Sequence, residues 1–336
     1  MKINFIGRIL LSVTSQCLML ANTGCGTDVA FQDSEPLSQR AKRGQIFNEN
    51  FTQGYVERKL DILFVVDNSG SMAEEQAKMG DKINSFISTL HDVDWQIGVT
   101  TTDISDGTYG LKGDLLTIAG TQSHILTPST PNYESAFKST VVRTESINCT
   151  NCASGDEQPI RAAIMAIEKR DTTNKNFFRS GADLGLVVLS DEDEMSSGPP
   201  QATQPAELTS LVKSIWQDNK RIFTFGMIIE PGDTQCLSQQ GGAGHYGTHV
   251  SLLATLTGGL TGSICDSDYA PTLGLIGENA RRLLEYIQLS YYPIIDSVQI
   301  KMTPDFNTTW NVQGRRIYMI PPPPKDTLIQ VSYVVE

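Results

Sequence analysis

The feature that most constrains the fold is the run from Leu60 to Met72, which reads LDILFVVDNSGSM. Its five consecutive apolar residues, Ile62 to Val66, are typical of a strand that is buried on both faces of a helix-covered parallel sheet. The strand leads directly into Asp67, Ser69 and Ser71. The sequence therefore places a carboxylate and two hydroxyl groups at the carboxyl end of a central strand.

Strands and helices alternate along most of the chain. Further strands are expected at residues 94–103, 184–190 and 221–229, and helices at residues 73–90, 156–169, 208–216, 247–259 and 271–289. This alternation predicts an α/β fold with a doubly wound, mostly parallel sheet and helices on both faces. Residues 104–130 are expected to be irregular, with a short hairpin or edge strand. In the last segment, 291–336, apolar residues alternate in short runs, which predicts a small C-terminal antiparallel β appendage.

The N-terminus has the pattern of a secretory signal peptide, because Lys2 and Arg8 precede an apolar run that is too short and polar to span a bilayer. The run ends in LANTGCG, which resembles a bacterial lipoprotein cleavage box with Cys25 as the lipidated residue. Ordinary signal cleavage is the alternative. The expected organisation is a signal peptide at 1–24, a tether at 25–58, an α/β domain at 59–290 and a β appendage at 291–336.

The negative net charge limits the kinds of molecule that the chain is expected to bind. The formal net charge is −12, and it becomes −14 when Lys2 and Arg8 are removed with the signal segment. A chain this acidic is poorly suited to nucleic acid or to an anionic lipid surface. Membrane contact is therefore expected only through a lipid anchor, in an exported protein of the cell envelope or one that is secreted. The same charge suits a protein that binds cations.

Three predicted strand ends carry carboxylates, at Asp67, Asp103 and Asp191. Because the carboxyl ends of parallel strands meet at one edge of a sheet, we expect these side chains to lie near one another. Carboxylate and hydroxyl oxygens are hard ligands, which favour Mg²⁺ or Ca²⁺. The alternative for the segment 67–71 is a plain strand-to-helix turn, in which Ser71 caps the helix and Asp67 orders the loop.

The spacing Asp67-x-Ser69-x-Ser71 after a buried strand resembles the metal-ion-dependent adhesion site of von Willebrand factor type A domains. The resemblance implies that these three residues form the first metal loop and that Asp191, after LVVLS, belongs to the third. In the second loop, Glu157 stands where the family has a threonine. Through DNSGSM, IGVTTTD and LSDEDE the chain also resembles a group of exported bacterial proteins of this type.

The resemblance implies a non-enzymatic, cation-binding module of the bacterial cell envelope, whose protein partner presents an acidic side chain to the ion. A third carboxylate at Glu157 would hold the ion more tightly and weaken its pull on such a partner. A metal-stabilised structural or assembly protein is therefore the first alternative. A Mg²⁺-dependent hydrolase with Asp67, Glu157 and Asp191 around the ion is the second, but the sequence offers it no general base of tuned pKa.

Several other polar residues are expected near the ion in a supporting role. Those expected to line the site or bind its waters are Thr101, Thr102, Asp103 and Asp193. Asp193, Glu192 and Glu194 are expected to form a solvated acidic loop, of which Asp193 is the residue expected nearest the ion.

Four cysteines follow the signal region, and an even number in an exported chain favours disulfides. The pairs nearest in sequence are Cys149 with Cys152 and Cys236 with Cys265. The first pair forms a CxxC motif, which as a redox site would open a helix; several loop residues separate it from the predicted helix, so we expect a structural disulfide. The alternative for the second pair is a zinc site with His245 and His249, which the glycine-rich stretch before His245 disfavours.

Overall fold

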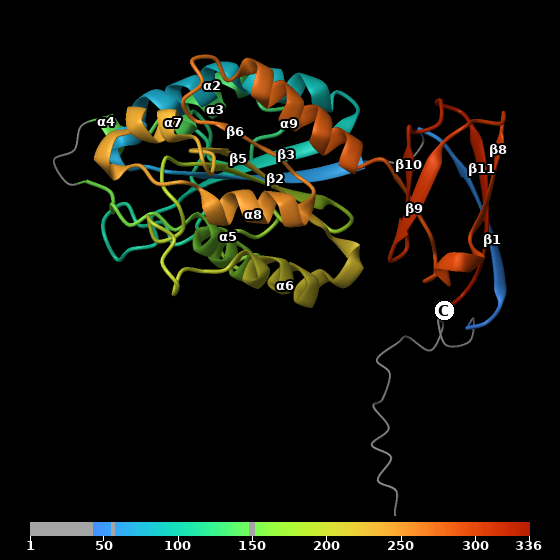
Figure 1. Cartoon of the computed structure of the whole chain (residues 1–336). Helices are drawn as coiled ribbons and strands as arrows, with labels where there is room; N and C mark the ends of the chain where they lie inside the picture. The colour runs from blue at the N-terminus through green and yellow to red at the C-terminus, as the bar shows by residue number, and fades with distance from the viewer. Residues whose placement is uncertain (1–42, 55–57, 148–151) are drawn as a thin grey trace, which may run out of the picture. The chain divides into compact units, whose positions relative to one another are not determined.

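The computed structural model describes residues 43–54, 58–147 and 152–336 (Figure 1). The predicted signal peptide, Cys25, the first part of the predicted tether and Cys149 lie outside the described residues. Within them, the chain forms a helix-covered α/β domain and a smaller β domain. In this part of the chain, no helix combines the length and the apolar character needed to cross a membrane.

The α/β domain is built on a five-stranded parallel sheet with the strand order β3-β2-β4-β5-β6. The strands are β2 (Arg58–Val66), β3 (Val93–Thr101), β4 (Asp183–Leu189), β5 (Ile222–Ile228) and β6 (Thr261–Ser263). All of β4 and most of β2 are buried, which explains why their sequences are dominated by apolar residues. Because β3 lies on one side of β2 and β4 on the other, the order of the strands reverses between β2 and β4.

Helices cover both faces of this sheet, as Figure 1 shows. One face carries α2 (Ala73–Ile87), α3 (Tyr133–Val141) and α9 (Ala270–Leu283), and the other carries α5 (Pro159–Glu168), α6 (Pro205–Trp216) and α8 (Thr248–Thr257). Met79 and Phe86 of α2 pack with Phe64 in one core, and Ile164 of α5 packs with Leu63 in the other. The predicted doubly wound α/β fold is confirmed.

The remaining helical segments of the described chain are short. They are α4 (Thr144–Ile147), α7 (Thr234–Gln239), η1 (Gly70–Met72), η2 (Ser88–Leu90), η3 (Gln217–Asn219), η4 (Gly241–Ala243) and η5 (Ile295–Ser297). The hairpin or edge strand expected within 104–130 is reduced to an isolated antiparallel bridge between Ile97 and Leu126. The short runs there lie over the edge of β3, and helix α3 follows them.

The β domain contains two three-stranded antiparallel sheets, in the orders β1-β11-β8 and β7-β10-β9. Their strands are β1 (Ile46–Thr52), β7 (Tyr286–Gln288), β8 (Gln299–Thr303), β9 (Thr309–Gln313), β10 (Arg316–Ile320) and β11 (Leu328–Val334). Ile329, Val331 and Tyr333 alternate along β11 and are buried in a separate core. The predicted antiparallel appendage is confirmed.

Two predicted boundaries of this domain are wrong. Residues 46–52, expected to be tether, form β1 and pair with β11 along its whole length. The helix expected at 271–289 ends at Leu283, and Ile287 instead lies in β7 opposite Ile317. Both errors have one cause: the partner strands are far away in the sequence, so local periodicity does not reveal the pairing.

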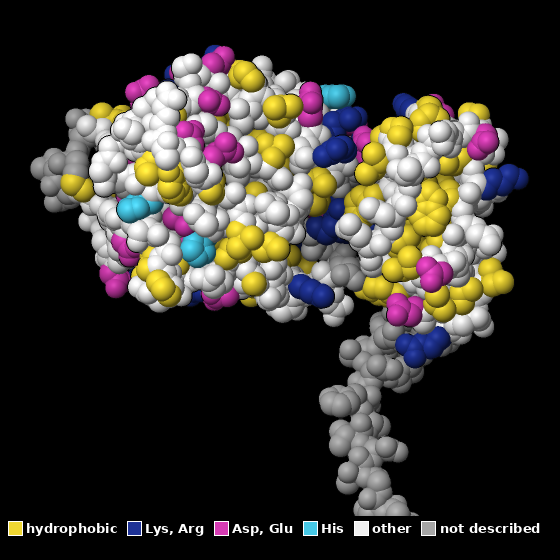
Figure 2. All heavy atoms as spheres, viewed as in Figure 1, with side chains coloured by type: hydrophobic (Ala, Val, Ile, Leu, Met, Phe, Trp, Pro, Cys, Tyr) yellow, Lys and Arg dark blue, Asp and Glu magenta, His cyan; other side chains and the backbone are white. Residues whose placement is uncertain are grey.

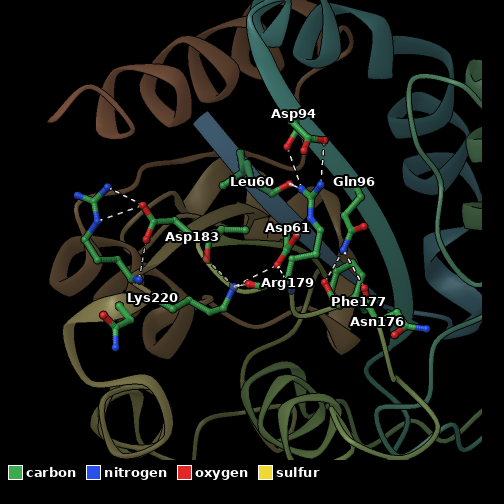
Figure 3. Close-up of polar contacts among 12 residues, drawn as sticks. Leu60, Asp61, Asp94, Gln96, Asn176, Phe177, Arg179, Asp183 and Lys220 are labelled. Atoms are coloured by element: carbon green, nitrogen blue, oxygen red, sulfur yellow. Dashed lines mark hydrogen bonds and ion pairs between the residues drawn. The ribbon is translucent and has the colours of Figure 1, made fainter. Parts of the chain in front are cut away.

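A buried ion cluster joins the amino ends of the strands (Figure 3). Asp61 on β2 is fully buried, and its carboxylate accepts hydrogen bonds from Arg179 Nε at 2.7 Å and Lys220 Nζ at 3.1 Å. Arg179 Nη1 also donates to Asp94 Oδ1 on β3 at 2.8 Å. Burial raises the pKa of Asp61, while the two cations lower it. The cluster therefore links β2 and β3 to the segments that enter β4 and β5.

Replacing Lys220 with Met should destabilise the protein by about 3–5 kcal/mol, because it removes one of the two cations that face the buried Asp61 carboxylate. Urea denaturation measures this loss. Lys213→Met, on the exposed face of α6, is the matched control and should change the free energy of unfolding by less than about 0.5 kcal/mol. Equal losses in the two variants would show that the ion pair contributes nothing specific.

Candidate metal centre

The carboxyl ends of β2, β3 and β4 meet at one edge of the sheet, as predicted. Val66, the last residue of β2, is in register with the last residues of β3 and β4. The next residues, Asp67, Thr102 and Ser190, therefore form a row just beyond the strands. The Asp67 N–H donates to the Leu189 carbonyl at 2.9 Å, and the Thr102 N–H to the Val66 carbonyl at 3.2 Å. This is where the strand order reverses, the place at which such sheets bind ligands.

The first loop presents three oxygen groups. Asp67 is fully buried; its Oδ1 accepts the Ser69 N–H at 2.8 Å and its Oδ2 accepts the Ser190 hydroxyl at 2.7 Å. The hydroxyls of Ser69 and Ser71 are 3.0 Å apart. The capping part of the turn alternative is wrong, because α2 begins after Met72 and no side chain caps it. The same alternative also expected Asp67 to order the loop, and Asp67 does so by accepting the Ser69 N–H.

Gln76, in the first half of α2, supports this loop from behind. It is fully buried, and its Nε2 donates to the Asp67 carbonyl at 2.7 Å and to the Ser146 hydroxyl at 2.9 Å. The Ser146 hydroxyl in turn donates to the Asn68 carbonyl at 2.9 Å. Because both backbone carbonyls are held by buried donors, the direction of the Asp67 side chain is set by packing and does not require a bound ion.

Asp191 brings the third loop to the same edge. It is fully buried, and neither of its carboxylate oxygens has a hydrogen-bond partner. Burial raises the pKa of Asp191, while the nearby Ser71 hydroxyl lowers it. Its backbone carbonyl accepts the His245 N–H at 2.8 Å, which joins this loop to the loop after β5.

Glu157 occupies the second loop, immediately before α5. It is fully buried; its Oε2 accepts the Thr102 hydroxyl, and its Oε1 has no partner. Burial and the charge on Asp67 raise the pKa of Glu157 well above its usual range. Thr102 also donates its N–H to the Val66 carbonyl, so Glu157 lies one residue away from the carboxyl end of β2.

The three carboxylates lack cationic partners. Burial and the charge on Asp191 raise the pKa of Asp67 to about 7. Among the described residues, no Lys, Arg or His side chain donates a hydrogen bond to Asp67, Glu157 or Asp191. Buried carboxylates in such a setting are unfavourable unless a cation or proton neutralises them.

The donor set fits a divalent cation such as Mg²⁺ or Ca²⁺. The unpartnered oxygens of Asp191 and Glu157 and the two serine hydroxyls are hard ligands. In the part of the chain that the structure describes, no three His, Cys, Asp or Glu side chains converge closely enough to hold an ion by themselves. An ion at this edge would therefore need the hydroxyls of Ser69 and Ser71 as well as carboxylates.

The residues expected in a supporting role have different environments. Thr102 donates to Glu157, and the Thr101 hydroxyl is buried without a partner. Asp103 accepts the N–H groups of Ser105 at 2.8 Å and Ser154 at 2.9 Å, so its carboxylate is occupied in holding two loops together.

The acidic loop after β4 is not solvated, which corrects the sequence expectation. Glu194 is fully buried, and its carboxylate accepts the Ile160 N–H at 2.7 Å and the Arg161 N–H at 3.0 Å at the start of α5. Asp193 accepts the His249 N–H at 3.0 Å at the start of α8, and its Oδ2 lies 2.8 Å from the ring Nδ1. Helix N-termini offer free N–H donors, which explains why these two acids turn inward.

Sequence reasoning missed three residues that shape the site, namely Gln76, Ser190 and Ser196. Only Ser190 carried a signal, because it lies between a buried strand and Asp191. The roles of the other two depend on loops that are distant in sequence, so no local pattern marks them.

The cysteine predictions are resolved for one pair. Cys236 and Cys265 form a disulfide, as predicted, so their sulfur atoms are not available for the alternative zinc site. The disulfide links α7, which follows β5, to the segment after β6. Cys149 lies outside the described residues, so its pairing with Cys152 stays a prediction.

Charges are unevenly distributed on the visible face of the α/β domain. Figure 2 shows Lys and Arg side chains gathered at the end of the domain opposite to that where Figure 1 labels α4 and α7, whereas acidic side chains are spread over the visible face.

Comparisons with known proteins concern the fold alone. No protein-family model and no curated protein matches the chain. Similar solved structures include a von Willebrand factor type A protein from Catenulispora acidiphila, with 16% identity over 88% of this chain and 66% of that one and a TM-score of 0.41. The open conformation of the pilus adhesin SpaC from Lactobacillus rhamnosus GG has 9% identity over 87% of this chain and 41% of that one, with a TM-score of 0.38.

A third similar structure is an aerotolerance-related membrane protein from Bacteroides fragilis, with 14% identity over 67% of this chain and 99% of that one and a TM-score of 0.35. This chain spans less than two thirds of the length of the first two structures. At these identities and TM-scores, the assignment of the fold rests on the strand order and the buried strands themselves.

Replacing Asp67 with Asn should stabilise the metal-free protein at pH 8. The folded-state pKa of Asp67 is raised to about 7, above the unfolded value of about 3.9. The folded state therefore binds more protons, and the stability of the metal-free wild type rises as the pH falls from 8 towards 4. The uncharged amide removes the contribution of Asp67 to this dependence, while the contributions of Glu157 and Asp191, whose pKa values are also raised, remain. Thermal melts in EDTA at pH 8 and pH 5 measure the dependence; a lower melting temperature for Asp67→Asn at pH 8 would contradict the expectation.

Proposed function

We propose that the chain is a von Willebrand factor type A-like module that binds Mg²⁺ or Ca²⁺ at this edge of the sheet and contacts a protein partner there. The observation that carries the proposal is the set of buried, unpartnered carboxylate oxygens on Asp191 and Glu157. Asp191 follows β4, and Glu157 accepts the hydroxyl of Thr102, which follows β3, so both lie at the edge where the strand order reverses. A divalent cation neutralises this cluster with the ligand type it prefers.

In the proposed site, Asp67, Ser69 and Ser71 hold the ion from the first loop, and Glu157 and Asp191 hold it from the second and third. The bound ion supplies positive charge for a partner's oxygen ligand. Gly70 and Ser71 are exposed, so a partner reaches the site from this side. An acidic side chain on the partner is the proposed ligand, although the third carboxylate at Glu157 reduces the positive charge available to it.

The burial of the site favours a second candidate function, in which the ion chiefly stabilises the fold. Asp67, Glu157 and Asp191 each have 0% exposed surface, so an ion held by them would cross-link three loops. Catalysis is less well supported. Lys78 and Arg143, two basic residues of the neighbouring segments, are each paired with glutamates. We therefore propose a binding protein rather than an enzyme.

We further propose an extracytoplasmic location at the cell envelope. The support is the Cys236–Cys265 disulfide, which persists in oxidising compartments, together with the signal-like N-terminus. Lipid attachment at Cys25 would supply the membrane contact.

Isothermal titration calorimetry with Mg²⁺ and Ca²⁺ tests the cation site. Wild type should bind at least one of the two ions, and Asp191→Ala should bind it at least about tenfold more weakly, because a ligand to the ion is lost. Asp305→Ala, an exposed acid in the β domain, is the matched control and should bind like wild type. If wild type shows no binding of either ion, the proposal is wrong.

Capture of envelope proteins with and without EDTA separates the two candidate functions. In an interaction mediated by the ion, EDTA and Asp191→Ala both abolish capture of the same partner. In the structural alternative, EDTA lowers the melting temperature, because a ligand that binds only the native state stabilises it, and partner capture persists.

A further inference from the structure

The loop that carries Glu157 has no helix or strand of its own between residues 152 and 158. Asp103 accepts its Ser154 N–H at 2.9 Å, and one residue of the loop after β4, Ser196, holds the backbone of Glu157 itself. The Glu157 N–H donates to the Ser196 hydroxyl oxygen at 3.2 Å, and the Ser196 N–H donates to the Glu157 carbonyl at 3.1 Å. The Ser196 hydroxyl also donates to the Gly155 carbonyl at 3.0 Å. Ser196 therefore holds both sides of the Glu157 backbone.

The backbone around Ser196 is strained. Met195 has φ +51° and Ser196 has φ +59°, a left-handed conformation that side chains other than glycine rarely adopt, here in two consecutive residues. The turn is closed by the Asp193 N–H, which donates to the Ser196 carbonyl at 2.8 Å, and by the Gly198 N–H, which donates to the Glu194 carbonyl at 2.9 Å. Such strain persists only where the surrounding contacts determine the conformation.

The same loop begins with Asp191, so one segment connects two of the three proposed metal ligands. Glu194 fastens this segment to the start of α5 through the N–H groups of Ile160 and Arg161. Ser196 then reaches back to Glu157, three residues before Ile160. The loop after β4 thus carries the Asp191 carboxylate itself. It also positions the Glu157 carboxylate, through the hydrogen bonds of Ser196 to the Glu157 backbone.

We propose that Ser196 is a positioning residue for the cation site: its strained turn holds Glu157 in the place where the Glu157 carboxylate and Asp191 can bind one ion. This inference rests on the proposed cation binding and deepens it. Ser196 does not itself hydrogen-bond to the carboxylates of Asp67, Glu157 or Asp191. Ser196 would act on the affinity for the ion indirectly, by orienting a ligand. Replacing residues of this kind typically weakens metal binding by about 10–100-fold.

Ser196→Gly tests the proposal, because glycine adopts φ +59° without strain while the hydroxyl and its two hydrogen bonds are lost. The metal-free variant should melt within about 2 °C of wild type. By calorimetry it should bind Mg²⁺ or Ca²⁺, whichever wild type binds, about 10–100-fold more weakly. Hydrogen exchange in the metal-free state should be faster at the Glu157 amide, which donates to the lost hydroxyl. Ser197→Gly, an exposed neighbour in the same loop, is the control and should match wild type.

The outcomes separate the inference from the function on which it rests. Wild-type protein that binds neither ion overturns both. Wild-type affinity in Ser196→Gly overturns the positioning role alone, and so does an equal loss of affinity in Ser197→Gly. Weak binding accompanied by a large fall in the melting temperature of the metal-free variant would also overturn it, because the residue would then act on the fold as a whole.

Discussion

Burial of the central strand on both faces is the constraint on which the site depends. Because helices cover β2 from both sides, the residue that follows it, Asp67, has 0% exposed surface. Its carboxylate must find its partners within the protein. Two are fixed donors, the Ser69 N–H and the Ser190 hydroxyl. The neighbouring strand ends add more acidic groups, and no Lys, Arg or His side chain of the described residues donates a hydrogen bond to Asp67, Glu157 or Asp191.

Buried acidic side chains have opposite environments at the two ends of the parallel sheet. At the amino end, Asp61 is paired with both Arg179 and Lys220 (Figure 3). At the carboxyl end, Asp67 and Asp191 have no cationic side chain among their described partners, and both oxygens of Asp191 are unsatisfied. A paired buried acid is a structural element. A cluster of carboxylates without cationic partners, at the edge where the strand order reverses, is the arrangement expected of a cation-binding site without its ion.

The loops at this edge are held mainly by side chain to backbone hydrogen bonds. Gln76 holds the first loop, Asp103 and Ser196 hold the second, and Glu194 fixes the third to α5. These residues lie outside the proposed ligand set, yet they determine where the ligands point. Under the proposed function, cation binding would depend on these supporting residues as well as on the ligands.

The sequence by itself determined the fold class, and it supplied all five proposed ligand positions as predictions. The apolar run before Asp67 and the run before Asp191 can only be buried parallel strands, and strand ends of that kind share one edge. Only the tertiary structure decided which acidic side chains keep oxygen atoms that are free to bind an ion. Asp103, Asp193 and Glu194 resemble Asp191 in sequence, but backbone N–H groups from other loops and helices occupy their carboxylates. The pairing of β1 with β11 and the hold of Ser196 on Glu157 were likewise decided by the fold, because both join segments that are distant in the chain and carry no local pattern.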